Sequence, residues 1–100
     1  MKLLLVCAGG MSTGILMNKM KKWFSEKGEE LVINAVGLGG YEEEYSNGYE
    51  CILIGPQVSY MLETIRKNTN GVPVAKIEPY DYALGNVENI MKQVHKLLGK

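Results

Sequence analysis

A short apolar segment that ends in a cysteine and runs into a pair of glycines occupies residues 3–14, LLLVCAGGMSTG, and limits the fold more than any other stretch. The apolar run over residues 2–6 is typical of a central β-strand whose two faces are both covered. Gly9 and Gly10 allow the backbone to turn sharply directly after that strand. Because the apolar spacing that follows is helical, the segment predicts a strand, a tight loop and a helix in immediate succession.

Cys7 is the chemically reactive residue of this segment. A thiol between a strand end and a helix start lies near unpaired backbone N–H groups at the positive end of the helix. Such a setting stabilises a thiolate and attracts an anion such as phosphate. Ser12 and Thr13 can cap the helix or donate their hydroxyl hydrogens to phosphate oxygens. We therefore predict that Cys7 is a nucleophile that becomes phosphorylated.

The composition indicates a small, electrically neutral protein. One hundred residues, of which 46% are apolar and 22% charged, fit a single domain over residues 1–100 with a modest core. Eleven basic and eleven acidic residues cancel, so the charge gives no reason to expect nucleic acid or an anionic membrane surface as a partner. No apolar run approaches the ~20 residues that span a bilayer, and we do not interpret the N-terminal run as a signal peptide. We expect a cytoplasmic monomer without membrane insertion, whose two cysteines are free thiols.

Helices and strands are predicted to alternate along the rest of the chain. The periodicity predicts a helix over 13–27, a strand over 31–36, a short helix or turn over 42–45, a strand over 51–54, a helix that includes 58–65, a strand over 72–77 and a helix over 87–98. This alternation indicates a parallel sheet with right-handed crossovers. We predict a single small α/β doubly wound domain, with a four-stranded parallel sheet of order 2-1-3-4 and helices on both faces.

The predicted strand order brings two distant turns together. With the first strand in the centre, the chain reverses direction between strands one and three, and ligands bind at the carboxyl ends of the strands at such a point. Cys7 should therefore lie beside the turn after the third strand, formed by Gly55, Pro56 and Gln57.

Two segments of the chain resemble a known family. Residues 7–13, CAGGMST, are similar to the C-S-A-G-M-S-T loop of IIB components of the lactose/cellobiose branch of the bacterial PEP-dependent sugar phosphotransferase system. Residues 53–62, LIGPQVSYML, are similar to the L-L-G-P-Q-x-x-Y-M-L segment of the same branch, and Asp81-Tyr82 also fits. Ala8 and Gly9 depart from the commoner serine and alanine, as does Gly14 from a frequent serine. The resemblance covers essentially the whole chain.

The resemblance implies a phosphocysteine carrier. In this family the cysteine takes a phosphoryl group from a phosphohistidine of the IIA component and passes it to a sugar held by the membrane IIC component. Carried over by position, Cys7 is the acceptor and needs no metal or cofactor. The implied phosphate-binding loop consists of Ala8, Gly9, Gly10, Met11, Ser12 and Thr13. Cellobiose, chitobiose and lactose all remain possible as the sugar.

Two other classes of function compete with this interpretation. A low-molecular-weight cysteine phosphatase or arsenate reductase uses C-x-x-x-x-x-R and a late D-P-Y, which Glu78-Pro79-Tyr80 echoes. Thr13 stands at the arginine position, however, and the chain's one arginine is Arg66. A flavodoxin-like binding module with an incidental thiol is the non-enzymatic alternative. The chain lacks G-x-G-x-x-G and G-x-x-x-x-G-K-[ST], which argues against a dinucleotide or a nucleoside triphosphate.

Other candidate residues have structural interpretations. We expect Cys51 to pack in the core, toward the opposite end of the sheet from Cys7 and too far away for a disulfide. His95 has no second histidine or cysteine at metal-binding spacing, which predicts a surface residue and no metal site. The acidic run over 42–44 reads as a solvated turn. The stripe of Met20, Trp23 and Phe24 is predicted to be core.

Overall fold

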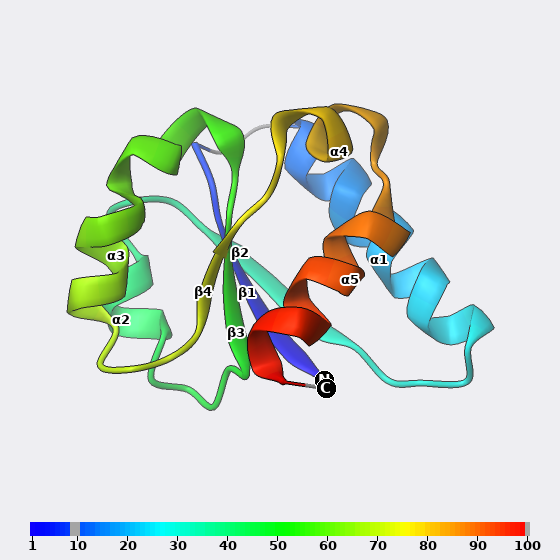
Figure 1. Ribbon diagram of the computed structural model, residues 1–100, viewed down its shortest axis with the longest axis horizontal. Helices are drawn as coiled ribbons and strands as arrows, with labels where there is room; N and C mark the ends of the chain where they lie inside the picture. The colour runs from blue at the N-terminus through cyan, green and yellow to red at the C-terminus, as the bar shows by residue number, and fades with distance from the viewer. Residues whose placement is uncertain (9–10, 100) are drawn as a thin grey trace.

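The predicted doubly wound α/β fold is confirmed (Figure 1). The computed structural model describes residues 1–8 and 11–99, except for the side chains of Met11 and Ser12. The strands are β1 (Lys2–Val6), β2 (Val32–Val36), β3 (Cys51–Ile54) and β4 (Val74–Lys76). The helices are α1 (Met11–Glu26), α2 (Tyr41–Glu44), the 3-10 helix η1 (Pro56–Met61), α3 (Leu62–Asn68), α4 (Pro79–Leu84) and α5 (Val87–Leu98). All strand pairs are parallel, in the order β2-β1-β3-β4.

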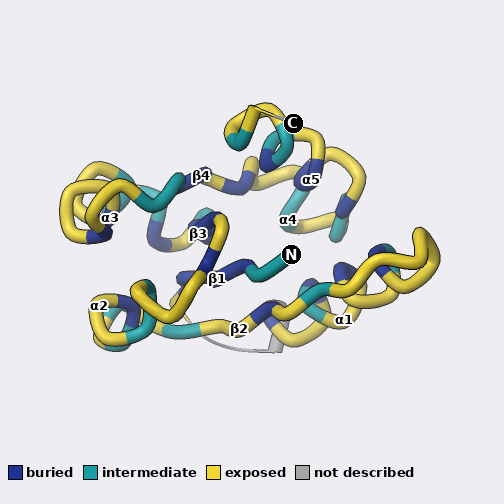
Figure 2. Tube along the Cα trace, turned by 90° about the horizontal axis from the view of Figure 1, so that it is seen from below, coloured by how far each residue is buried: buried dark blue, intermediate teal, exposed yellow. Residues whose placement is uncertain are grey.

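The apolar run of β1 is continuous because β1 lies in the middle of a three-layer structure. Helices α2 and α3 cover one face of the sheet, and α1, α4 and α5 lie on the other (Figure 1). Leu3 and Leu5 pack in the cluster with α1 and α5, whereas Leu4 and Val6 pack in the cluster with α3. Successive side chains of a strand point to opposite faces, so a strand between two helical layers must be apolar at every position. The buried backbone of β1 and β3 stands out against the exposed outer turns of the helices (Figure 2).

The two edge strands differ from these central strands. In β2, Ile33 is buried, whereas Val32 is half exposed, because its outer side carries no further strand. The predicted strand over 72–77 is shorter in the structure: β4 comprises Val74–Lys76. Pro73 lies just before it, at a strand start, where a residue without an N–H is tolerated.

Helix α5 follows the predicted apolar stripe closely. Val87, Ile90, Met91 and Val94 recur at helical spacing, and all four are buried. The side-chain oxygen of Asn86 accepts a hydrogen bond from the N–H of Asn89 (3.2 Å) and caps the first turn. At the other end, Gly99 has a φ of 75° and ends the helix.

Two helices differ from the sequence prediction. Helix α1 begins at Met11 rather than at Thr13, so the second half of the predicted phosphate loop forms the first helical turn. Helix α4 was not predicted, although Pro79 at its first position and Gly85 at its left-handed C-cap (φ 63°) are both ordinary helix-boundary signals. The six residues of α4 are too few for an apolar stripe to be recognised, and none of them is fully buried.

Candidate functional site

Cys7 directly follows the central strand β1 and lies between the ends of β2 and β3. Its N–H donates to the carbonyl oxygen of Val36 at the end of β2 (3.0 Å), which continues the sheet by one residue. The residue is 3% exposed. Burial fixes the thiol in place, and a pocket of about 310 Å³ beside it is lined in part by Cys7, Thr13, Met17 and Gly37. The pocket gives the site an opening on the β2 side of the sheet.

Thr13 contacts the thiol from helix α1. Its hydroxyl donates to Cys7 Sγ at 3.3 Å, and the residue is 5% exposed. Side chains of a helix lean toward its N-terminus, so a residue in the first turn reaches back toward the strand that precedes the helix. The Thr13 hydroxyl therefore donates to the sulfur from the side where the N-terminus of α1 lies. The same end of the helix attracts an anion.

Tyr82 joins the site from α4 and is the residue that the sequence prediction missed. Its hydroxyl lies 3.3 Å from Thr13 Oγ1, so the hydroxyls of two residues 69 positions apart meet next to Cys7. The neighbouring Glu78-Pro79-Tyr80, which resembles the late D-P-Y of the cysteine phosphatases, does not supply this tyrosine, since Tyr80 is 74% exposed. The Asp81-Tyr82 step was noticed as part of the resemblance, without a role. Tyr82, and not Tyr80, lies on the face of α4 that is directed toward Thr13 in α1.

The turn after β3 lies against Cys7, as predicted. The N–H of Gly55 donates to the carbonyl oxygen of Val6 (2.9 Å). A Cβ at Gly55 would stand 3.5 Å from Cys7 Cβ and 3.4 Å from Gln57 Oε1. Pro56 then occupies the first position of η1 and turns the chain away from the sheet. Gly55 and Gln57 therefore form the wall of the site on the β3 side.

The structure describes only part of the predicted phosphate-binding loop. Ala8 is exposed beside Cys7. Gly9, Gly10 and the side chains of Met11 and Ser12 lie outside the described residues. Their assignment to a phosphate-binding loop stays a prediction.

Cys51 lies away from this site, as predicted. It is fully buried and pairs in register with Leu3, at the start of β1, whereas Cys7 follows its end. Both cysteines are free thiols. Burial raises the pKa of the Cys51 thiol to about 12, so this sulfur is held as the neutral thiol. Cys51 is a packing residue of the core.

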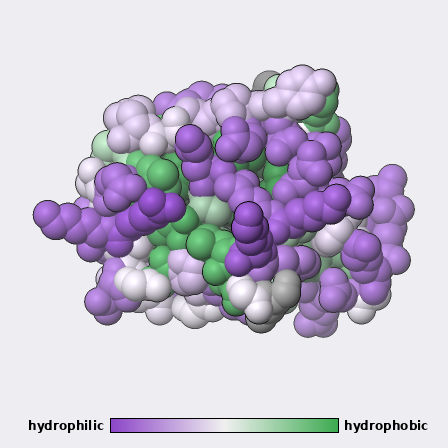
Figure 3. Space-filling model, in the orientation of Figure 1, coloured by the Kyte–Doolittle hydropathy of each residue, from purple (hydrophilic) through white to green (hydrophobic). Residues whose placement is uncertain are grey.

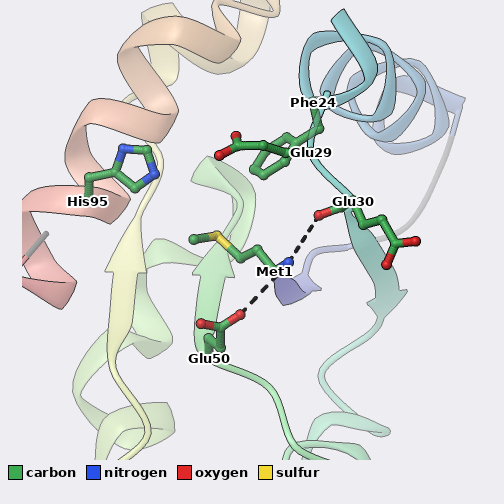
Figure 4. A pocket seen from close by; sticks show the side chains of 6 residues that line it. All are labelled: Met1, Phe24, Glu29, Glu30, Glu50 and His95. Atoms are coloured by element: carbon green, nitrogen blue, oxygen red, sulfur yellow. Dashed lines mark hydrogen bonds and ion pairs between the residues drawn. The ribbon is translucent and has the colours of Figure 1, made fainter. Parts of the chain in front are cut away.

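Another pocket, lined by Met1 and Glu50 among others, lies at the amino ends of the strands (Figure 4), whereas Cys7 follows the carboxyl end of β1. Its volume is about 510 Å³. The amino group of Met1 donates to the carbonyl oxygen of Glu30 (3.0 Å) and lies 4.0 Å from a carboxylate oxygen of Glu50. His95 lines this pocket and is partly exposed, in keeping with its prediction as a surface residue. Carboxylates repel a phosphate, so this pocket does not fit the chemistry predicted for Cys7.

The described residues form neither a metal-binding cluster nor a helix that could span a membrane. Among residues 1–8 and 11–99, no group of three or more histidine, cysteine or acidic side chains is arranged to hold a metal ion. Within the same residues, no helix is both long and apolar enough to cross a membrane.

Comparisons with known proteins identify the family of the chain. A family model described as "PTS system, Lactose/Cellobiose specific IIB subunit" matches residues 2–93. The chain is 32% identical to the oligo-beta-mannoside-specific EIIB component of Bacillus subtilis, with 97% of this chain and 95% of the relative covered. It is 35% identical to part of the lactose-specific EIICB component of Staphylococcus epidermidis, where the match covers 79% of this chain and 14% of the longer protein.

A solved structure supports the same assignment. The solution structure of the cellobiose-specific phosphotransferase IIB component from Borrelia burgdorferi superposes with a TM-score of 0.80 at 28% identity and covers 99% of this chain and 92% of that one. The sequence matches and the fold thus point to the same family. The chain belongs to the lactose/cellobiose-specific IIB family of the bacterial sugar phosphotransferase system and is a sugar phosphotransferase component.

Proposed function

We propose that this protein is a phosphocysteine carrier that takes a phosphoryl group from a phosphohistidine of a IIA component and delivers it to a disaccharide of the cellobiose, chitobiose or lactose type. The sugar is held by a IIC transporter, and the carrier works from the cytoplasm. One observation carries the proposal: the Cys7 sulfur lies at the end of the central strand and accepts a hydrogen bond from Thr13, in the first turn of α1. EIICB fusions such as the staphylococcal relative support a IIC partner for IIB domains.

The first transfer is a substitution at phosphorus. The Cys7 thiolate attacks the phosphorus of the phosphohistidine, the S–P bond forms, and the P–N bond breaks. The departing imidazole nitrogen takes up a proton when it is released as neutral histidine. In this proposal, backbone N–H groups at the start of α1 and the hydroxyl of Thr13 donate to the phosphoryl oxygens as negative charge redistributes. Tyr82 is 3.3 Å from Thr13 and can orient that hydroxyl.

The second transfer reverses the bonding at sulfur. A sugar hydroxyl oxygen attacks phosphorus, the O–P bond forms, the S–P bond breaks, and the thiolate is restored while the hydroxyl proton is lost to a base. Both partners must reach Cys7 in turn. The open pocket on the β2 side, which Thr13 and Val36 line, and the exposed Ala8 give such access, while Gly55 lies against Cys7 on the β3 side. We expect the interfaces to be small and transient.

The competing phosphatase interpretation has less support. Arg66, the chain's one arginine, lies on α3, where its guanidinium donates to Glu63 (2.9 Å) and to the carbonyl oxygen of Val74 (3.4 Å). Thr13, at the position where a phosphatase has arginine, supplies neither a positive charge nor bidentate donors. A phosphate monoester with a poor leaving group would therefore react slowly, whereas a phosphohistidine carries an activated P–N bond.

The test is a reconstituted transfer. The protein is incubated with phosphoenolpyruvate, the general phosphotransferase components and a matching IIA, and the phosphate is located by peptide mass spectrometry. We expect phosphate on Cys7, no labelling of Cys7→Ser, and full labelling of the matched control Cys51→Ser. Phosphate on His95, or full labelling of Cys7→Ser, would refute the proposal.

A further inference from the structure

A groove runs along the free edge of the sheet, beside β4. Helix α3 lies on one side of β4 and α5 on the other, and between them Figure 3 shows a patch of hydrophobic surface crossed by hydrophilic side chains. The groove has a volume of about 480 Å³. Its apolar lining is Leu62, Val74, Ala75 and Leu97, and Leu97 is 42% exposed. Val74 and Ala75 are themselves buried (3% and 4% exposed), so Leu62 and Leu97 supply the accessible apolar surface of the groove.

The edge of β4 itself is already protected against another strand. Val74 and Lys76 are the residues whose outer backbone groups face away from β3. The carbonyl oxygen of Val74 accepts from Arg66 (3.4 Å), and that of Lys76 accepts from Gln93 Nε2 (2.7 Å). Both carbonyls that an added strand would need are thus occupied by side chains. A partner in this groove is better placed as a helix, which satisfies its own backbone hydrogen bonds.

The charged side chains of the groove all carry the same sign. Arg66, Lys76 and Lys96 line it, and no acidic residue does. The Arg66 guanidinium forms an ion pair with the Glu63 carboxylate on its own helix (2.9 Å). Within the described part of the chain, neither Lys76 nor Lys96 makes an ion pair. In a protein whose charges sum to zero, this is a local basic concentration around an apolar floor.

The charge also decides between possible occupants. A second copy placed symmetrically on this groove would bring the same cations face to face, because a two-fold interface pairs each patch with itself. A partner helix with an apolar stripe bordered by carboxylates would contact the apolar lining with its stripe and pair with Lys76 and Lys96 through its carboxylates. The groove lies at the β4 edge of the sheet, whereas the pocket of Cys7 opens on the β2 side, so both can be occupied together.

We propose that the groove between α3 and α5 is a docking site for an acidic amphipathic helix of a partner protein, separate from the phosphoryl-transfer site. The apolar face of that helix lies on Leu62 and Leu97, and its carboxylates pair with Lys76 and Lys96. Electrostatic pairing at the rim fixes the orientation and speeds the encounter. Such a contact tethers a partner at the side of the carrier and leaves Cys7 open.

The test uses a designed helical peptide as the probe. The peptide carries leucine at helical spacing i, i+3, i+4 and i+7 and glutamate on both sides of that stripe, and its charge-reversed counterpart has lysine for every glutamate. The full-length ¹⁵N-labelled protein is titrated with each peptide and followed by chemical shifts. We expect saturable shifts at β4, Gln93 and the last turns of α5 with the acidic peptide, weakened by salt, and none with the basic peptide.

Charge-reversal variants make the test specific. We expect Lys76→Glu/Lys96→Glu to bind the acidic peptide about tenfold more weakly, whereas Lys21→Glu/Lys22→Glu, on the exposed side of α1, binds like the parent protein. Lys96→Glu alone serves if the double variant loses its native spectrum. Absence of saturable shifts, equal binding of both peptides, or equal weakening by the α1 variant would overturn the proposal. A dimer in which Lys76 and Lys96 become protected would also overturn it, because a second copy would then be the occupant.

Discussion

Replacing Thr13 with valine tests the hydroxyl next to the sulfur with little change of shape. The threonine is 5% exposed, and its Oγ1 lies 3.3 Å from both Cys7 Sγ and the Tyr82 hydroxyl. A hydrogen bond to a charged group in a buried site contributes about 1.5–3 kcal/mol, so its loss corresponds to roughly 10- to 100-fold in rate if the bond forms in the transition state. We expect Thr13→Val to slow phosphoryl transfer to Cys7 by about that factor.

Stability should change much less than the transfer rate. Valine keeps the buried methyl group and loses the hydroxyl, which shifts the free energy of unfolding by about 1 kcal/mol. Thr13→Ser is the matched control, because it keeps the hydroxyl and loses the methyl group. It should transfer at nearly the parent rate. Tyr82→Phe should have a smaller effect alone, and the double variant should be non-additive, since the two hydroxyls contact one another.

The assay is a single-turnover measurement by rapid quench, with phosphorylated IIA in excess over the carrier. Thermal unfolding of each variant confirms that the fold is retained. A parent-like rate in Thr13→Val would show that the hydroxyl only packs against the sulfur. A rate in Thr13→Ser as low as in Thr13→Val would assign the effect to the methyl group and refute the same reasoning.

Four further predictions concern other parts of the molecule. Burial holds the Cys51 pKa at about 12 in the folded protein, so the unfolded chain releases this proton first as pH rises above ~8.5. The free energy of unfolding should therefore fall by about 1.4 kcal/mol per pH unit until the pH reaches about 12. Urea titrations at several pH values should show this slope in the parent protein and not in Cys51→Ala. The hydrogen bond from Tyr49 (2.6 Å) lowers the pKa of Glu44. This pair should therefore stabilise the fold above the ordinary glutamate pKa, and the stabilisation should be lost as pH falls through the lowered pKa of Glu44. Carboxyl chemical shifts should show a higher Glu44 pKa in Tyr49→Phe. At Gly55 the backbone (φ −67°, ψ 153°) accepts any residue, but a valine would press on the Cys7 side chain, and we expect Gly55→Val to fold and to accept phosphate more slowly in the IIA assay. Steady hydrolysis of p-nitrophenyl phosphate should be negligible where IIA labels Cys7 quickly, and turnover that depends on this cysteine would instead indicate a phosphatase.

The sequence was sufficient to predict the elements that depend on short-range pattern. The continuous apolar run of β1 could only fit a strand covered on both faces, and this places it in the centre of the sheet. The strand order follows from that position together with right-handed crossovers, and it brings Gly55 beside Cys7. Gly55 marks this turn through the space it leaves, since a Cβ there would stand 3.5 Å from Cys7 Cβ, and Pro56 turns the chain away from the sheet. The position of Cys7 at the end of the central strand and the turn beside it were therefore predictable from the sequence.

The tertiary structure decided the features that depend on how distant segments approach one another. Tyr82 enters the site because α4 crosses the start of α1, and neither its own short helix nor its periodicity carries that information. The choice between Tyr80 and Tyr82 depends on the rotation of α4, which is set by its packing against α1 and by the turn at Gly85. The same holds for the groove at β4, since Arg66 and Gln93 meet the strand edge from two different helices. Local patterns determine which face of a segment is buried, whereas side-chain contacts across the sheet depend on where the crossover connections place each helix.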